Sequence, residues 1–284
     1  MPICASAPHH VTSIFLPVYT SKLETTGSLG AGLAVEPRAI GCLGRKLYSR
    51  PIETTTAARA LKLLGAASRG IHVATPLPPA KGYAVSASTA VVAGTAYSVS
   101  RGLTIGTGLL AAHKAEILEK TGLGDVASIS CGVGVVYRYG AGAPGLARVD
   151  CRPVPSTVSL LALEGEGGVH TRSLLEKAGS SFFRREARRR LERVFEDPSF
   201  ETFMAESMSF TLDNKLYAPI IGGRLDSLTR TPGLIGFYAK KLVAIIAVEA
   251  DMAADALEYL AGRFGRERLR VLYGSDHGVR VWWE

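Results

Sequence analysis

The order of strand and helix patterns limits the folds open to this chain more than any other feature. In the first half, β-branched and apolar runs predict strands at residues 11–19, 33–37, 71–75 and 126–139. Helical spacing occupies residues 54–69, 87–99 and 104–120, with Gly122 as a C-terminal cap. Strands and helices do not alternate regularly, and no GxGxxG follows the first strand. An all-parallel dinucleotide-binding sheet is therefore disfavoured.

The second half differs in composition and in pattern. The change falls at Arg152-Pro153-Val154-Pro155, which predicts a linker or domain edge. A strand at 157–164 is followed by a long charged helical region over about 171–208. The remaining pattern predicts, in order, a strand at 243–249, a helix at 250–265 and strands at 268–275 and 278–284. This β-α-β-α-β-β order is close to a ferredoxin-like unit, so the sequence predicts an α+β protein of two halves.

The net charge of the chain is compatible with several kinds of binding partner. The 284 residues carry a net charge of +8, which suits a nucleic acid, a membrane surface or an anionic small substrate. Much of the charge lies in one run, Arg184, Arg185, Arg188, Arg189, Arg190 and Arg193. Glutamates interrupt this run and no aromatic residues are interleaved with it, so a solvated helix face is favoured over a nucleic-acid surface.

The cysteines and the apolar runs argue against several classes of protein. None of the four cysteines forms a CxxC pair or lies near a histidine cluster, so a zinc site is not expected. The N-terminus lacks a signal-peptide pattern, so a secreted disulfide framework is not expected either. No apolar run approaches the roughly 20 residues of a membrane span. We expect a cytoplasmic protein with no membrane partner.

One candidate site is the loop at residues 78–89, between a strand and a helix. Small residues would let its backbone approach a ligand closely, and free N–H groups at a helix N-terminus favour phosphate. Ser86 and Ser88 could add hydroxyl groups. The loop is not a Walker A sequence, and a loop that only caps a helix has the same appearance.

A second candidate is the pair of carboxylates Glu116 and Asp125. His113 and Glu116 share one face of a predicted helix, and Asp125 follows a glycine-containing turn nine residues after Glu116. Two carboxylates that converge near a phosphate loop suit magnesium binding and alignment of a hydroxyl nucleophile. A solvated glutamate and a turn-forming aspartate would give the same pattern. A third candidate, the glycine-rich turn at 26–32 with its Ser28, could bind a carboxylate or be a plain hairpin turn.

The combination of these segments resembles a known family. PPAKGYAVSAS (78–88) is similar to the phosphate loop of GHMP kinases, which include galactokinase and the homoserine and mevalonate kinases. HHVTSIF (9–15), TTGSLGAG (25–32) and AHKAEILEKTGLGDV (112–126) resemble the archaeal pantoate kinases among them. The resemblance implies the GHMP kinase fold, with a ribosomal-protein-S5-domain-2-like N-terminal half (1–152) and a ferredoxin-like C-terminal half (153–284). It also implies ATP-dependent phosphorylation of pantoate to 4-phosphopantoate in coenzyme A biosynthesis, with Mg²⁺.

The resemblance further implies a role for each matching residue. Asp125 would orient the attacking hydroxyl, Glu116 would bind magnesium, and Ser86 would contact the ATP phosphates or the magnesium. The substrate would be held by Ser28, His113, Arg138 and His10. The nucleotide would lie against Pro79, Gly82, Tyr83, Ala84, Val85, Ser86, Ala87 and Ser88.

Two departures from the family and several alternatives accompany this reading. Ala84 replaces the second loop glycine, and its methyl group would be strained if the backbone there needs a positive φ. A C-terminal glycine motif has only the candidates Gly222-Gly223, Gly233 and Gly236. The alternatives are another GHMP kinase acting on mevalonate, homoserine or a sugar, a non-catalytic binding module, and a nucleic-acid-binding protein. No nucleic-acid partner is expected, and a homodimer is expected only by analogy with the family.

Overall fold

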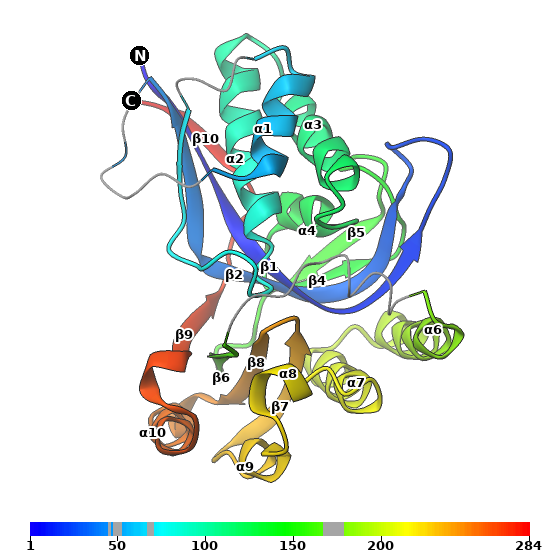
Figure 1. Ribbon diagram of the computed structural model, residues 1–284, viewed down its shortest axis with the longest axis vertical. Helices are drawn as coiled ribbons and strands as arrows, with labels where there is room; N and C mark the ends of the chain where they lie inside the picture. The colour runs from blue at the N-terminus through cyan, green and yellow to red at the C-terminus, as the bar shows by residue number, and fades with distance from the viewer. Residues whose placement is uncertain (45–46, 48–52, 67–70, 167–178) are drawn as a thin grey trace.

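The computed structural model describes residues 1–44, 47, 53–66, 71–166 and 179–284 (Figure 1). The strands are β1 (Ile3–Val18), β2 (Gly27–Leu43), β3 (Ile71–Ala74), β4 (Val135–Arg138), β5 (Val149–Arg152), β6 (Val158–Glu164), β7 (Leu234–Lys240), β8 (Val243–Glu249), β9 (Leu269–Gly274) and β10 (Arg280–Trp283). The helices are α1 (Thr55–Leu63), α2 (Val85–Ser100), α3 (Ile105–Leu118), α4 (Asp125–Cys131), α6 (Ser181–Glu196), α7 (Phe200–Asp213), α8 (Ala218–Ile221), α9 (Leu225–Thr229) and α10 (Ala253–Phe264). Short 3₁₀ turns, η1 (Ala250–Met252) and η2 (Arg266–Arg268), flank α10.

The strands form one antiparallel sheet whose main path runs β10-β1-β2-β9-β6-β8-β7. The long hairpin of β1 and β2 is its centre, and β3 and β4 also pair with β2. Helices α1 to α4 cover one face of this hairpin, while α7 to α10 surround β6 to β8 at the other end of the molecule (Figure 1). Both ends of the molecule combine helices with antiparallel strands, which agrees with the α+β class expected from the sequence.

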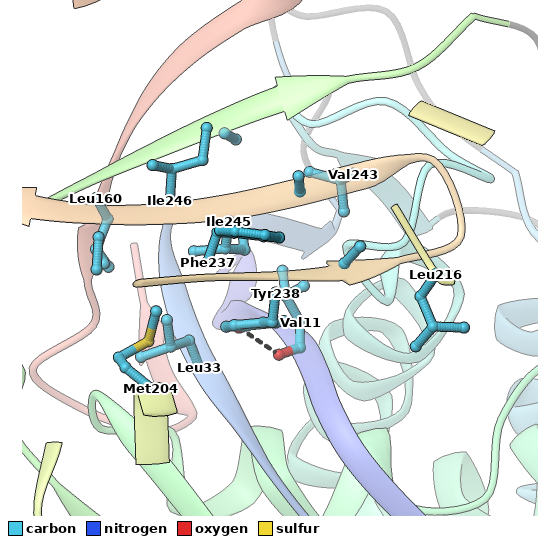
Figure 2. Packing of buried hydrophobic residues seen from close by; sticks show 14 of the residues in the cluster. Val11, Leu33, Leu160, Met204, Leu216, Phe237, Tyr238, Val243, Ile245 and Ile246 are labelled. Atoms are coloured by element: carbon cyan, nitrogen blue, oxygen red, sulfur yellow. Dashed lines mark hydrogen bonds between the residues drawn. The ribbon is translucent and has the colours of Figure 1, made fainter. Parts of the chain in front are cut away.

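The two halves share a sheet and a core. β9 joins β2 to β6, and β10 pairs with β1 beside the N-terminus. In the core, Tyr238 of β7 lies against β1 and donates a hydrogen bond of 2.8 Å to the Val11 carbonyl (Figure 2). Leu33 and Leu160 belong to the same buried cluster. A boundary at residue 152 stays a prediction, because pairing and packing both continue across it.

One predicted strand is wrong over half its length. Residues 126–131 form most of helix α4, and only Val135–Arg138 is extended. The helix begins because the Glu116 carboxylate accepts hydrogen bonds from the N–H groups of Asp125 and Val126 at its first turn. This long-range cap overrides the β-branched local pattern of VASIS.

The ends of other elements also differ from the prediction. Helix α3 ends at Leu118 with Glu119 as its cap, so Gly122 is not the predicted C-terminal cap. The charged helical region is two helices that separate before Ser199, and its predicted start at 171–178 lies outside the described residues. β7 was not predicted as a strand, because LIGFYAK lacks regular alternation.

The arginine run follows the favoured solvated-face reading except at one position. Arg190 lies buried on α6, with ion pairs of 2.7 Å to Glu206 and 2.5 Å to Asp213. The other five arginines of the run are exposed. The exposed Arg193 also pairs with Glu206 at 3.0 Å, so the run keeps most of α6 in solvent and links it to α7 through Arg190 and Arg193.

The four cysteines form two disulfides, Cys4–Cys42 and Cys131–Cys151, which the sequence analysis did not expect. Cys4 and Cys42 are directly opposite each other in the pairing of β1 with β2, and Cys151 of β5 lies near the end of α4. The pairing depends on strand register, which spacing along the chain does not give. Among the described residues, no helix is both long and apolar enough to cross a bilayer.

Candidate active site

A cavity of about 490 Å³ lies where the β1–β2 hairpin, the start of α2, the start of α4 and the β7–β8 hairpin meet. It brings together most of the segments that the sequence singled out. Its walls include Ser28, Pro79, Gly82, Tyr83, Ala84, Val85, Ser86, Asp125 and Arg138 from the predicted site. The volume is within the range of small-molecule and cofactor pockets.

The phosphate loop forms one end of this cavity. Helix α2 starts at Val85 after Ala84, which adopts φ 53° and ψ 35° and gives no side-chain cap to the first turn. Ala87 N–H donates to the Ala84 carbonyl at 3.0 Å, so the N–H groups of Val85 and Ser86 are the ones open to an anion in the cavity. The backbone N–H of His10 donates to the Tyr83 carbonyl at 3.3 Å, which fastens the loop to β1.

The loop glycine is required by a close approach as well as by backbone conformation. Gly82 has φ 128°, and a Cβ atom there would lie 2.5 Å from the carbonyl oxygen of Lys240. We expect Gly82→Ala to destabilise the fold by about 2 kcal/mol and to weaken the binding of an anion at the loop, because the loop must move away from the hairpin. Thermal or urea unfolding measures the first effect and calorimetry the second.

Ala84→Gly is the matched control for that substitution. A left-handed alanine costs roughly 1 kcal/mol, and glycine removes that strain while adding freedom to the unfolded chain. The free energy of unfolding is therefore expected to stay level or rise. Unchanged stability in Gly82→Ala would contradict the packing described here.

Asp125 is part of the cavity wall, with its side chain 13% exposed. Its Oδ1 accepts hydrogen bonds from His10 Nδ1 at 2.8 Å and from Thr12 Oγ1 at 2.9 Å. Burial alone would raise the pKa of this carboxyl group, but Lys240, His10 and Arg138 together hold it well below its usual range. Asp125 is therefore an ionised, firmly oriented acceptor.

Glu116 lies behind Asp125 and does not reach the cavity wall. A Cβ atom on Gly122 would be 2.1 Å from Glu116 Oε1 and 3.0 Å from Asp125 Oδ2, so the two carboxylates converge at a point where only glycine fits. Burial and the neighbouring Asp125 charge raise the pKa of Glu116 to about 8. The close approach predicted from the turn is present in the structure.

Arg138 is the most deeply buried cation at the site, with 1% of its surface exposed. Its guanidinium donates to the Ser28 carbonyl at 3.2 Å and to Ser128 Oγ at 2.5 Å. Among the described residues it has no carboxylate within ion-pair distance, although it lines the cavity. A buried guanidinium without an ion pair favours an anionic ligand.

Several predicted site residues lie elsewhere. His10 is fully buried and touches Asp125, while His113 Nε2 donates to the carbonyls of Leu23 and Thr26, 3.1 Å from each. Neither histidine lines the cavity, and neither do Ala87 and Ser88. The hydroxyl of Ser88 contacts His9 Nδ1 at 2.9 Å inside the core.

His9 gives the fold a pH dependence. Its Nε2 contacts Thr75 Oγ1 at 2.7 Å, and burial lowers its pKa to about 3. The unfolded histidine binds a proton below its ordinary pKa near 6.5 and the native one does not. Stability is therefore present above that pH and falls by about 1.4 kcal/mol per pH unit as the pH drops toward 3.

Urea unfolding at pH 7.5, 6.0 and 5.0 measures this dependence. His9→Gln is expected to reduce the slope by about one proton, whatever it does to stability at pH 7.5. An identical slope in both proteins would contradict a neutral, buried His9. His10, whose pKa burial lowers to about 4, contributes in the same direction.

Sequence reasoning missed two groups at the site. Lys240 and Lys241 line the cavity from the turn between β7 and β8, and Thr54 and Thr55 do so from the start of α1. The adjacent lysines before an apolar run were the available signal. The three glycine candidates for a C-terminal motif do not line this cavity, whereas Lys240 and Lys241 do.

Comparison with known proteins agrees with this architecture. A phosphotransferase related to the coenzyme A biosynthesis pathway has a TM-score of 0.80 at 20% identity, with 99% of each chain covered. The MDDEF complex with MVAPP, AMPPCP and magnesium has a TM-score of 0.69 at 15% identity, covering 100% of this chain and 99% of the other. The fold is that of the GHMP kinases, as the resemblance implied.

The sequence also has a curated homologue. Pantoate kinase of Thermococcus kodakarensis is 27% identical over 286 residues, which cover 90% of this chain and 92% of the relative. No protein-family model matches the chain.

Proposed function

We propose that this protein is an ATP-dependent pantoate kinase, which transfers the γ-phosphoryl group of ATP to the primary hydroxyl of pantoate. The observation that carries the proposal is the placement of Arg138 and Asp125 on one cavity wall, with the phosphate loop at the other end. Pantoate offers a carboxylate for the guanidinium and a hydroxyl for the aspartate. The homology to a curated pantoate kinase supports the same substrate.

The role proposed for each cavity residue follows from its position. Arg138 would bind the substrate carboxylate by charge-assisted hydrogen bonds, with Ser28 beside it. Asp125 would accept the hydrogen bond of the attacking hydroxyl and fix its direction. Its lowered pKa makes it a weak base, so its contribution is orientation in a reaction that needs little base strength.

His10 acts through Asp125 in this proposal and not by contact with the substrate. Together with Thr12 it donates to the same carboxylate oxygen, which leaves Oδ2 for the hydroxyl. His113 holds the β1–β2 loop by its two carbonyl contacts and thereby shapes the end of the cavity at Ser28. The direct substrate contacts expected of both histidines are replaced here by positioning roles.

Magnesium suits the donors that this chain offers. Asp125 and Ser86 present oxygen atoms to the cavity, and Mg²⁺ binds a few carboxylates together with substrate phosphates and water. Glu116, the predicted magnesium ligand, does not line the cavity. The ion, when bound, neutralises charge on the transferring phosphates. Among the described residues, no three His, Cys, Asp or Glu side chains form a dedicated metal cluster. Glu116 would contribute by holding the start of α4 behind Asp125.

A substrate panel tests the proposal. ADP release is measured with ATP and magnesium on D-pantoate, mevalonate, homoserine and galactose. Turnover on pantoate alone is expected. Turnover on another alcohol would keep the kinase and replace the substrate, and salt-sensitive RNA or DNA binding without turnover would favour the nucleic-acid alternative. A cytoplasmic location and a homodimer stay predictions.

A further inference from the structure

Lys240 lines the cavity but has no role in the reaction as proposed so far. It is the last residue of β7, and its side chain lines the cavity together with Asp125 and Arg138. Its Nζ lies 5.0 Å from the centre of the Phe15 ring, which forms part of the same wall. The side chain is thus directed along an aromatic face into the site.

The charge of Lys240 is not paired with an acidic side chain. Among the described residues, it makes no ion pair within 4.0 Å and no side-chain hydrogen bond. Burial is the main influence on its pKa, which lies below the ordinary lysine value, and Asp125 acts in the opposite direction. A partly buried ammonium group without an ion pair is ready to bind an anion.

The backbone of the hairpin holds this lysine beside the phosphate loop. Leu242 N–H donates to the Lys81 carbonyl at 2.9 Å. Gly82 packs so closely on the carbonyl of Lys240 that a Cβ atom would be 2.5 Å away. The loop that would bind the ATP phosphates and the turn that carries Lys240 therefore form one unit.

The other cations near the loop have other contacts or more exposed positions. Lys81 Nζ donates to the Gly165 carbonyl, and Arg138 is hydrogen-bonded to Ser28 and Ser128. Lys120 is exposed at the rim. Lys241 also lines the cavity without an ion pair among the described residues, but only Lys240 of these cations lies over the Phe15 ring.

We propose that Lys240 is a catalytic residue that binds the phosphoryl group during its transfer. This inference rests on the proposed kinase function. The acceptor hydroxyl oxygen forms a bond to the γ-phosphorus, and the bond from that phosphorus to the bridging oxygen breaks, leaving its electron pair on ADP. The hydroxyl proton passes to water. Lys240 keeps its proton and donates to the non-bridging oxygens, whose charge it offsets.

Kinetics on three variants test the assignment. Lys240→Met is expected to lower kcat by about 10²–10³-fold with little change in the KM for pantoate, as loss of one such donor does in other enzymes. Lys240→Arg should recover part of that loss. Lys62→Met, which removes an exposed lysine of α1 outside the cavity, should match the wild type. A kcat within about threefold of the wild type in Lys240→Met would overturn the proposal.

Measurements of nucleotide affinity test the role of Lys240 independently of which alcohol is the substrate. Calorimetric affinities for AMPPCP and ADP, each with magnesium, are compared in wild type and Lys240→Met. Loss of about tenfold or more for AMPPCP, with ADP nearly unchanged, would support contact with the transferred group. Equal losses for both nucleotides would overturn it. If the wild type binds AMPPCP but does not phosphorylate pantoate, the proposed substrate is wrong, and this comparison still decides the role of Lys240.

Folding of the variants is checked by thermal unfolding. Removing a partly buried cation beside Arg138 and Lys241 should leave the melting temperature level or raise it, so a purely structural role predicts the opposite sign. Lys240→Gln replaces Lys240→Met in both assays if the methionine variant does not fold.

Discussion

Asp125→Asn is expected to lower kcat by about 10²-fold or more, because the attacking hydroxyl loses the ionised group that orients it. The amide keeps the shape of the carboxylate but loses its charge. Its NH₂ group also cannot accept the hydrogen bonds that the Asp125 carboxylate accepts from His10 and Thr12. The attacking hydroxyl then lacks an ionised acceptor, while the phosphate loop remains intact. Steady-state rates on pantoate and ATP measure the effect, and the KM for ATP should change little.

Asp150→Asn is the matched control for this substitution. Asp150 is an exposed aspartate of β5 that lies outside the cavity. Its variant should retain wild-type kinetics. If Asp125→Asn kept more than about a tenth of the wild-type kcat while folded, Asp125 would not be the residue that orients the hydroxyl.

Arg138→Met is expected to weaken pantoate binding by a factor of roughly 30 to several thousand, equivalent to about 2–5 kcal/mol for a desolvated charge contact. The anionic end of the substrate would lose its only fully buried cationic partner among the described residues of the wall. Arg138→Lys should restore little, because an ammonium group cannot reproduce the planar, bidentate geometry of guanidinium.

The binding measurement for Arg138→Met uses calorimetry with pantoate in the presence of AMPPCP. Arg152→Met, which removes an exposed arginine of β5, is the control. The AMPPCP affinity of Arg138→Met should stay close to the wild type. A loss of nucleotide affinity without a loss of pantoate affinity would assign Arg138 to the other end of the cavity.

Much of the fold could be predicted from local sequence. The strands at 157–164 and 243–249 and the helices at 87–99 and 104–120 have patterns that their packing reinforces, so their positions agree to within a few residues. Helix α4 could not be predicted in this way. Its first turn is capped by Glu116, and that contact exists only once α3 and the Gly122 turn have formed.

Some residues of the site could likewise be predicted from their sequence neighbours, and others could not. The phosphate loop, Glu116 and Asp125 have recognisable neighbours in sequence, and the structure brings them together. Lys240 reaches the cavity from a hairpin more than a hundred residues away, which only the sheet order determines. The burial of His10, His113 and Ser88 was equally hidden, because the residue type alone does not say whether a polar side chain faces a ligand or the core.

Identification of the reaction product is the most direct test of the proposed function. The protein is incubated with ATP, magnesium and D-pantoate, and the mixture is followed by phosphorus NMR and mass spectrometry. We predict one new phosphate monoester, on the primary hydroxyl of pantoate, formed in equal amount with ADP and absent with Asp125→Asn. ADP formed together with inorganic phosphate alone, or no consumption of ATP at all, would contradict the account of this site as a pantoate kinase.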